Sequence, residues 1–195
     1  MFLIKHIHPL FTGRCTIHND ATEQLPFTAD HLLALTSENT VRANVQEPMR
    51  IVAVSVPRDP SMSPLPLLMK SLSEVVGSDR NVPFEGGYSR RFLAAPDGYN
   101  ISFHNTLAHA SFNARLHYPH NMEANYFIKG QGEYVWKNGQ QQFDFEKHHG
   151  TMLLVEHDAH EVKIGGSDSI AICLFSPPLK GTERLRLNQE SGSSY

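Results

Sequence analysis

Short stretches of alternating apolar and polar residues, separated by glycine turns, constrain the fold of this chain most. Ile101 and Phe103 alternate with polar neighbours, and residues 151–155, which are apolar from Met152 onward, are typical of a buried strand. The dipeptide Asn138-Gly139 divides another such region, and it favours a hairpin turn because both positions tolerate positive φ. Short strands at close spacing predict an all-β sandwich or barrel.

The remaining strand candidates in the second half of the chain fit the same prediction. Residues 114–118 alternate, and the apolar runs 162–164 and 170–175 flank the turn-forming pair Gly165-Gly166. One short helix is expected before the strands, because apolar residues between Leu68 and Val76 recur at helical spacing until Gly77. No internal repeat is visible in the sequence.

Residues 1–65 differ in composition from the rest. Two fragments could be ordered: residues 31–35 follow Asp30, a potential helix cap, and residues 50–56 alternate like a strand. We expect a weakly structured N-terminal extension, or a dispensable or misassigned start, before a folded domain over residues 66–195. Prolines, which end helices and central strands, stand at positions 9, 26, 48, 57, 60, 64 and 66.

Composition excludes several classes of function. The 195 residues, 40% hydrophobic and 19% charged with a net charge of −3, are typical of a soluble globular protein. A basic stripe with interleaved aromatic residues is absent, which argues against nucleic acid as a partner. The longest apolar runs are far shorter than the roughly 20 residues of a membrane helix. Cys15 and Cys173 are the only cysteines, which favours a reducing, cytoplasmic location.

A cluster of histidines indicates metal chemistry. Eight of the 12 histidines lie between His104 and His160. His117, His120 and Glu123 fall within seven residues, directly before an apolar strand. Any one of these side chains is more often a solvated strand or loop residue, but ligands on different strands of a closed barrel converge on its interior. The cluster therefore predicts a metal site.

Several longer strings resemble ectoine synthase over residues 69–195, in the order of that family. They are SLSEVVGSDRNV, Arg90-Arg91, ISFHNT, HYPHNMEANYFIKGQGE, GTM, HDAH and CLFSPPLKGTE. The resemblance implies a cupin-type double-stranded β-barrel (jelly roll), cytoplasmic and usually a homodimer. It also implies a metal-dependent hydro-lyase that closes N-γ-acetyl-L-2,4-diaminobutyrate to the compatible solute ectoine with loss of water. The metal would be Fe(2+), with Zn(2+) as the alternative, and the role would be protection against osmotic stress.

The resemblance also implies roles for individual residues. Glu123 and His160 match metal ligands; the less favoured alternative for each is a structural residue, which for Glu123 means an exposed carboxylate at a strand edge. Glu183 matches a glutamate that handles the substrate and could transfer protons, with Tyr118 as a second catalytic group; a glutamate in this context is otherwise usually solvated. The matches to substrate-binding positions, each of which could instead be core filler, are Thr106, Tyr118, Cys173, Phe175 and Glu183.

The chain departs from the family at several positions. Leu153 stands where the family has its third metal ligand, a tyrosine, and Asn121 and Leu185 replace histidines. The family's cavity tryptophan maps near Gly87 or Tyr88. Two interpretations follow: either His117 or His120 completes a shifted metal site, or metal binding is weak and the protein has diverged. The alternatives to ectoine synthase are a related cupin enzyme acting on another small amino acid or amide, and a non-catalytic cupin that binds a small solute.

Overall fold

The computed structural model describes residues 2–4, 13–19, 24–49, 51–58, 61–148 and 151–183. Within these ranges the chain is almost entirely β-structure and divides into two compact units, Met1–Glu74 and Val75–Tyr195. The sequence-based boundary between residues 65 and 66 therefore lies a few residues before the boundary between the units. No helix in the described ranges is long and apolar enough to cross a membrane.

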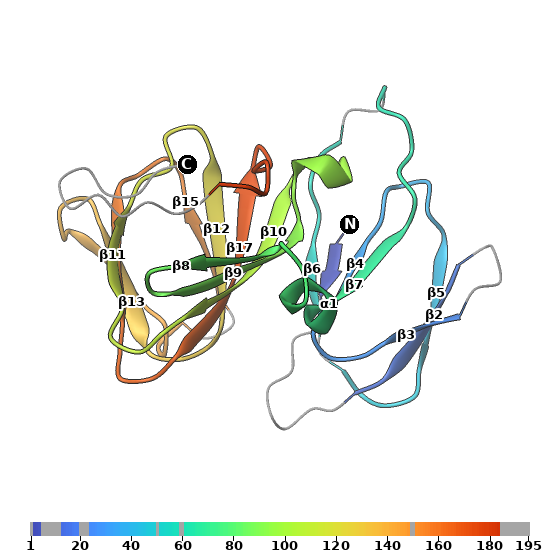
Figure 1. The fold of residues 1–195 in the computed structure, drawn as a ribbon, viewed down its shortest axis with the longest axis horizontal. Coiled ribbons are helices and arrows are strands. Elements are labelled where there is room, and N and C mark those ends of the chain that lie inside the picture. The colour runs from blue at the N-terminus through green and yellow to red at the C-terminus, as the bar shows by residue number, and fades with distance from the viewer. Residues whose placement is uncertain are drawn as a thin grey trace. The chain divides into compact units, whose positions relative to one another are not determined.

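The C-terminal unit is a jelly roll of two antiparallel sheets, shown in green to red in Figure 1. The first sheet contains, in spatial order, β15 (Met152–Val155), β12 (Met122–Lys129), β17 (Ser169–Ser176), β10 (Ser102–Ala108), β9 (Gly87–Leu93) and β8 (Asn81–Phe84). The second contains β11 (Asn113–Leu116), β16 (His160–Ile164), β13 (Gly132–Trp136) and β14 (Gln141–Asp144). The predicted all-β cupin-type barrel is confirmed.

Alternating burial explains why these segments form strands around one interior. Along β15 the second and fourth residues are buried, and along β16 the first, third and fifth are buried. Because successive side chains point to opposite faces of a sheet, this period of two directs one set inward. β17 is buried at nearly every residue because it pairs with β10 on one edge and β12 on the other.

The predicted turns are present. Lys137 and Asn138 adopt φ values of 52° and 54°, followed by Gly139 at 84°, in the hairpin between β13 and β14. Gly165 and Gly166 lie between β16 and β17, also as predicted. A short 3-10 helix, η1 (Ala95–Asp97), connects β9 to β10. Local sequence determines these turns because left-handed backbone at Asn and Gly costs little.

The N-terminal unit contains two small sheets. The first holds β6 (Val52–Val54), β1 (Phe2–Ile4), β4 (His31–Ala34) and β7 (Leu68–Ser71), and the second holds β3 (Gln24–Phe27), β2 (Cys15–Asn19) and β5 (Val41–Val45). The strand expected over residues 50–56 is present as β6. The helix expected over residues 31–35 is wrong. That segment is β4, whose backbone pairs with β1 on one side and β7 on the other, so tertiary pairing overrides the local cap signal.

The expected helix after the linker is shorter than the pattern suggested. Leu68–Ser71 forms β7, and only α1 (Leu72–Val76) is helical. Ser71 caps α1 because its Oγ accepts a hydrogen bond from the Glu74 amide at 3.2 Å, while the Glu74 carboxylate accepts one from the Ser71 amide at 2.6 Å. The reciprocal cap marks where the strand ends and the helix begins.

Candidate active site

A largely apolar cavity lies inside the C-terminal jelly roll. The space in which the centre of a water-sized molecule can move has a volume of about 80 Å³. By the same definition, a cavity that holds one buried water needs roughly 10–15 Å³. The cavity can therefore hold a small organic molecule. Aromatic rings such as Phe84, Phe112 and Phe127 form much of its wall. The polar residues on the wall are Ser89, His104, Thr106, Tyr118, Glu123, Tyr134, Ser169 and Cys173.

The two-residue period of the strands brings these distant side chains together. On β10, His104 and Thr106 both face the cavity, and on β17 the alternate residues Cys173 and Phe175 do so. Glu123 is on β12, which pairs with β17. Sequence neighbours therefore separate to opposite faces, while residues far apart in the chain share one wall.

Glu123 is an ionisable group held in an apolar environment. Its side chain is 3% exposed, and its Oε2 has no hydrogen-bond partner among the described residues. Burial raises the pKa of Glu123 to about 8. A buried carboxylate without compensation costs free energy, so such groups occur mainly where a site uses them.

His160, the first residue of β16, faces Glu123 from the other sheet. Its Nε2 lies 3.4 Å from Glu123 Oε2 and makes no hydrogen bond within the described part of the chain. His160 Nδ1 donates to the backbone carbonyl of Asp158 at 3.0 Å, since a carbonyl can only accept. Nε2 is therefore the nitrogen with the free lone pair, and burial lowers the pKa of His160 so that the ring favours its neutral form.

This pair fits a metal ion. Two buried ligand atoms, a carboxylate oxygen and an imidazole nitrogen, face each other without hydrogen bonds, and a backbone carbonyl orients the histidine as in metal sites. In the described ranges, no group of three His, Cys, Asp or Glu side chains is placed to hold a metal. A third protein ligand would therefore have to come from another residue type.

The structure does not bring His117 or His120 to this pair. His117 is half-buried, and its Nε2 hydrogen-bonds to the backbone carbonyl of His157 at 3.1 Å. His120 is exposed in the turn before β12. Neither residue belongs to the cavity wall.

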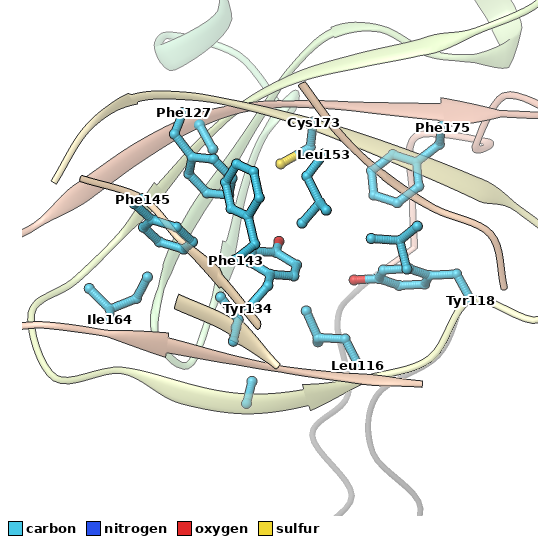
Figure 2. Packing of buried hydrophobic residues seen from close by; sticks show 14 of the residues in the cluster. Leu116, Tyr118, Phe127, Tyr134, Phe143, Phe145, Leu153, Ile164, Cys173 and Phe175 are labelled. Carbon is cyan, nitrogen blue, oxygen red and sulfur yellow. The ribbon is translucent and has the colours of Figure 1, made fainter. Parts of the chain in front are cut away.

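Tyr134 offers a phenolic oxygen instead. Its ring stacks on that of His160 with centroids 5.1 Å apart, and it is 5% exposed. Burial and then the Glu123 carboxylate raise the pKa of Tyr134 well above its ordinary value. Figure 2 shows the hydroxyl groups of Tyr134 and Tyr118 directed into the interior between the two sheets.

The other residues predicted to bind substrate mostly lie on the cavity wall. Thr106, Tyr118, Cys173 and Phe175 all contribute to it. Tyr118 packs edge-on against Phe175, with centroids 5.2 Å apart. Burial raises the pKa of the Cys173 thiol, so this side chain is a neutral wall group rather than a nucleophile.

Glu183 is placed differently. Its carboxylate accepts hydrogen bonds from the amides of Lys180 and Gly181 at 2.6 and 2.7 Å and lies 3.5 Å from Arg91 Nη1. Burial opposes ionisation, but these amides and Arg91 together lower the pKa of Glu183. Glu183 is not among the residues of the cavity wall, and the predicted catalytic role at this position stays a prediction.

Comparisons with known proteins identify the family. The family model described as ectoine synthase matches residues 67–193. The chain belongs to the ectoine synthase family. L-ectoine synthase of Sporosarcina pasteurii is 34% identical over 117 residues, which are 60% of this chain and 87% of the relative. L-ectoine synthase of Desulfosudis oleivorans is 33% identical over 129 residues, 66% of this chain and 96% of the relative. These homologues place the chain among enzymes of the lyase class, the hydro-lyases.

Solved structures support the family and the fold. The crystal structure of ectoine synthase from P. lautus has a TM-score of 0.54 and 30% identity, covering 58% of this chain and 80% of that one. An oxalate decarboxylase of Bacillus subtilis has a TM-score of 0.62 at 12% identity and covers 92% of this chain and 63% of that one. The second likeness shows the fold alone, and it extends over both units. That decarboxylase contains Mn(II) centres, which were studied in another of its structures, also 12% identical to this chain.

The structure locates the departures from the ectoine synthase pattern. Leu153 is buried inside the barrel near Cys173 (Figure 2), so the position of the family's tyrosine ligand faces inward but carries no oxygen. Asn121 donates from Nδ2 to the backbone carbonyl of Pro177 at 2.7 Å. Tyr88 is 39% exposed, and neither it nor Gly87 is on the cavity wall. Leu185 lies outside the described residues.

One functional candidate in this ectoine synthase unit had no signal of its own in the sequence. His104 is 1% exposed, lies on the cavity wall, and has no hydrogen-bond partner at Nε2 in the part of the chain that is described. Arg91 Nε–H donates to Ser89 Oγ at 3.5 Å, so the Ser89 hydroxyl can donate onward to His104 Nδ1 at 3.1 Å. That order leaves the ring proton of His104 on Nε2. Burial and the Arg91 charge lower the pKa of His104 well below its ordinary value, which keeps the ring neutral.

Proposed function

We propose that this protein is a metal-dependent cyclising hydro-lyase that closes N-γ-acetyl-L-2,4-diaminobutyrate to ectoine with loss of water. Family membership over residues 67–193 supports the reaction class. The observation that carries the proposal is the buried Glu123–His160 pair beside an apolar cavity of small-molecule size. The activity is assigned to residues 66–195.

The cavity suits a dehydrating cyclisation. The α-amine of the substrate attacks its own acetamide carbonyl carbon, and the tetrahedral intermediate then loses its oxygen as water. Glu123, His160 and the phenol of Tyr134 would hold the metal. When bound, the metal would act as a Lewis acid toward the acetamide oxygen of the substrate. The aromatic wall keeps bulk water away, so that hydrolysis of the amide does not compete with ring closure.

His104 supplies a fixed hydrogen-bond donor for the substrate. Its Nε2–H has no protein acceptor among the described residues, and an unpaired buried donor favours a ligand with an acceptor oxygen. The carboxylate and acetamide of the proposed substrate both carry such oxygens. Tyr118, whose hydroxyl is also directed inward, is proposed to transfer protons during loss of water.

The deciding experiment is an assay with defined metal. The protein is incubated with N-γ-acetyl-L-2,4-diaminobutyrate and Fe(2+) or Zn(2+), and ectoine is followed by chromatography. Glu123→Gln keeps the shape of the side chain but removes a charged ligand, so we expect both bound metal and ectoine formation to fall at least about 100-fold. Glu156→Gln, at an exposed position, is the matched control and should change neither. Ectoine at background level with the wild-type protein would reject the proposal.

Leu153 favours a second candidate. Replacement of a ligand tyrosine by leucine would suit a related cupin enzyme that acts on another small amino acid or amide. The same preparation, tested on related acetylated diamino acids, distinguishes the two candidates. Saturable turnover of one of these, absent in Glu123→Gln, together with no ectoine, would support the second candidate.

The remaining parts of the proposal follow from the family resemblance. We propose Fe(2+) as the metal, with Zn(2+) as the alternative, a cytoplasmic location, and a homodimer that contributes to tolerance of osmotic stress. Metal analysis of the purified protein tests the first of these directly. A metal-free protein that nevertheless makes ectoine at full rate would contradict the metal dependence.

A further inference from the structure

The N-terminal unit repeats the strand topology of the catalytic unit. In the C-terminal unit, β12 pairs with β15 and β17, and β13 pairs with β14 and β16. In the N-terminal unit, β1 pairs with β4 and β6, and β2 pairs with β3 and β5. All eight pairings are antiparallel, so β1 to β6, in chain order, correspond one by one to β12 to β17.

The registers agree in detail. The ladder between β2 and β5 and the ladder between β13 and β16 both contain five residue pairs. Phe27 at the end of β3 and Phe145 directly after β14 occupy matching positions, and both are 1% exposed. The likeness to oxalate decarboxylase, which covers 92% of the chain, also includes this unit. The N-terminal unit is therefore a second jelly roll rather than an unrelated arm.

This second jelly roll lacks the polar pair of the first. By register, Glu123 stands opposite the last residue of β15, and Phe2 stands opposite the last residue of β4. His160 opens β16, and the residue that opens β5 is Val41. By register, phenylalanine and valine stand at these two positions, so the described part of the N-terminal unit repeats no Glu–His pair. This directs attention to the surface of the unit.

Among the described residues, the second jelly roll has no counterpart of β11. In the catalytic unit, β16 lies between β13 and β11. The corresponding β5 pairs with β2 on one side, and its other edge pairs with no described strand. Residues 42–45 are exposed, and Val45 is 54% exposed. An open strand edge presents unpaired N–H and C=O groups to another chain.

The two edges of this small sheet are not equivalent. β3, at the far edge, contains Pro26, which has no N–H to donate and so protects that edge. β5 has the sequence Val41-Arg42-Ala43-Asn44-Val45, without proline. It is therefore the edge that can accept a further strand.

We propose that β5 of a second copy of this chain occupies the position that β11 occupies in the catalytic unit, forming a two-fold symmetric dimer through a continuous sheet. In an antiparallel register centred on Ala43, Val41 faces Val45 of the other copy and Arg42 faces Asn44. Apolar residues meet at both ends and no like charges oppose each other, as favourable cross-strand pairs require. A two-fold axis through Ala43 makes the same patch serve both copies.

A disulfide at the axis tests the register in the full-length protein. Opposed residues of an antiparallel pair have Cα atoms about 4.5–5.5 Å apart, within disulfide range. Ala43→Cys should therefore form a covalent dimer under mild oxidation with diamide. Asn44→Cys, one residue along the same strand, is the matched control. In the proposed register, the two substituted positions do not face each other: they lie about 7 Å apart along the strand direction, in addition to the distance between the two strands. The native Cys15 and Cys173 are buried and should stay reduced.

We expect Ala43→Cys to cross-link at least about tenfold faster than Asn44→Cys. Equal rates would overturn the proposal, as would a wild-type protein that is monomeric by light scattering at micromolar concentration. A second measurement is the mass of the assembly in solution. Ala43→Asp brings two carboxylates face to face at the axis and should halve that mass. Gln141→Asp, at an exposed position of β14, is the control and should leave the mass unchanged. An unchanged mass for Ala43→Asp would count against the interface. Because neither measurement uses the enzymatic assay, failure here leaves the proposed activity intact.

Discussion

Glu123 and His160 lie facing each other in an arrangement that is unfavourable for stability. Both side chains are buried, and their facing atoms make no hydrogen bond among the described residues. The pKa of Glu123, raised to about 8 by burial, reflects that unfavourable environment. Buried polar groups usually have hydrogen-bond partners. A ligand that binds both atoms would account for this pair, whereas a contribution to folding stability would not.

The family resemblance pointed to Glu123 and His160, and the structure places their side chains 3.4 Å apart; their role as metal ligands stays a prediction. Glu123 and His160 belong to extended strings that match the family, so their roles could be carried over. His117 and His120 are close to Glu123 in sequence, but neither is a residue of the cavity wall. Tyr134 and His104 reach the interior through strand pairing over long sequence separations, and no local pattern reports that.

The first prediction concerns Tyr134. If its phenol is the third ligand, Tyr134→Phe should weaken binding of Fe(2+) or Zn(2+) at least about tenfold, measured by metal titration. Tyr118→Phe removes the other inward hydroxyl and is the control that should bind metal nearly as tightly as the wild type. Adding Leu153→Tyr to Tyr134→Phe should restore affinity, because it returns a phenol at the family's position. The reverse ranking of the two single variants would assign the ligand to Tyr118.

At the scale of elements, local signals succeeded for turns and failed where long-range pairing decides. The β13–β14 hairpin follows from Asn138 and Gly139, whose backbone preferences act within the turn. In residues 31–35, a cap signal and four apolar residues suit a helix as well as a strand. Pairing of β4 on both edges decides for the strand, and pairing partners far along the chain leave no periodic signature.

The connection between β12 and β13 gives a prediction at this scale. Gly130 has φ of 104°, and a Cβ there would lie 2.5 Å from Ser169 Cα. Gly139 has φ of 84°, but a Cβ there would meet nothing within 4 Å. Gly139→Ala should therefore cost about 1 kcal/mol from backbone strain alone, and Gly130→Ala about 3 kcal/mol or more because backbone must also move. Urea denaturation followed by Trp136 fluorescence measures both, and equal costs would contradict the close approach of β17.

Over the residues that the structure describes, the whole molecule combines a jelly roll that carries the Glu123–His160 pair with a unit in which no such pair is found. The sequence shows no internal repeat, yet six strands recur with the same pairings. The shared strand topology of the two units could not be predicted from the sequence. Strand topology is defined by backbone hydrogen bonds, and many different apolar sequences are compatible with the same strand pairing. The described strands of the N-terminal unit therefore repeat the pairings of β12 to β17.

Two compact units with one candidate metal site predict two separable responses to metal. The single tryptophan, Trp136, belongs to β13 and reports only on the C-terminal unit, whereas circular dichroism reports on the strands of both. Metal at 100 times its dissociation constant should stabilise the unit that binds it by about 2.7 kcal/mol. We expect metal to move the fluorescence transition to higher urea and to leave part of the circular dichroism transition unmoved. In Glu123→Gln, metal should move neither. A single coincident transition that metal shifts as a whole would mean that the two jelly rolls unfold as one cooperative structure.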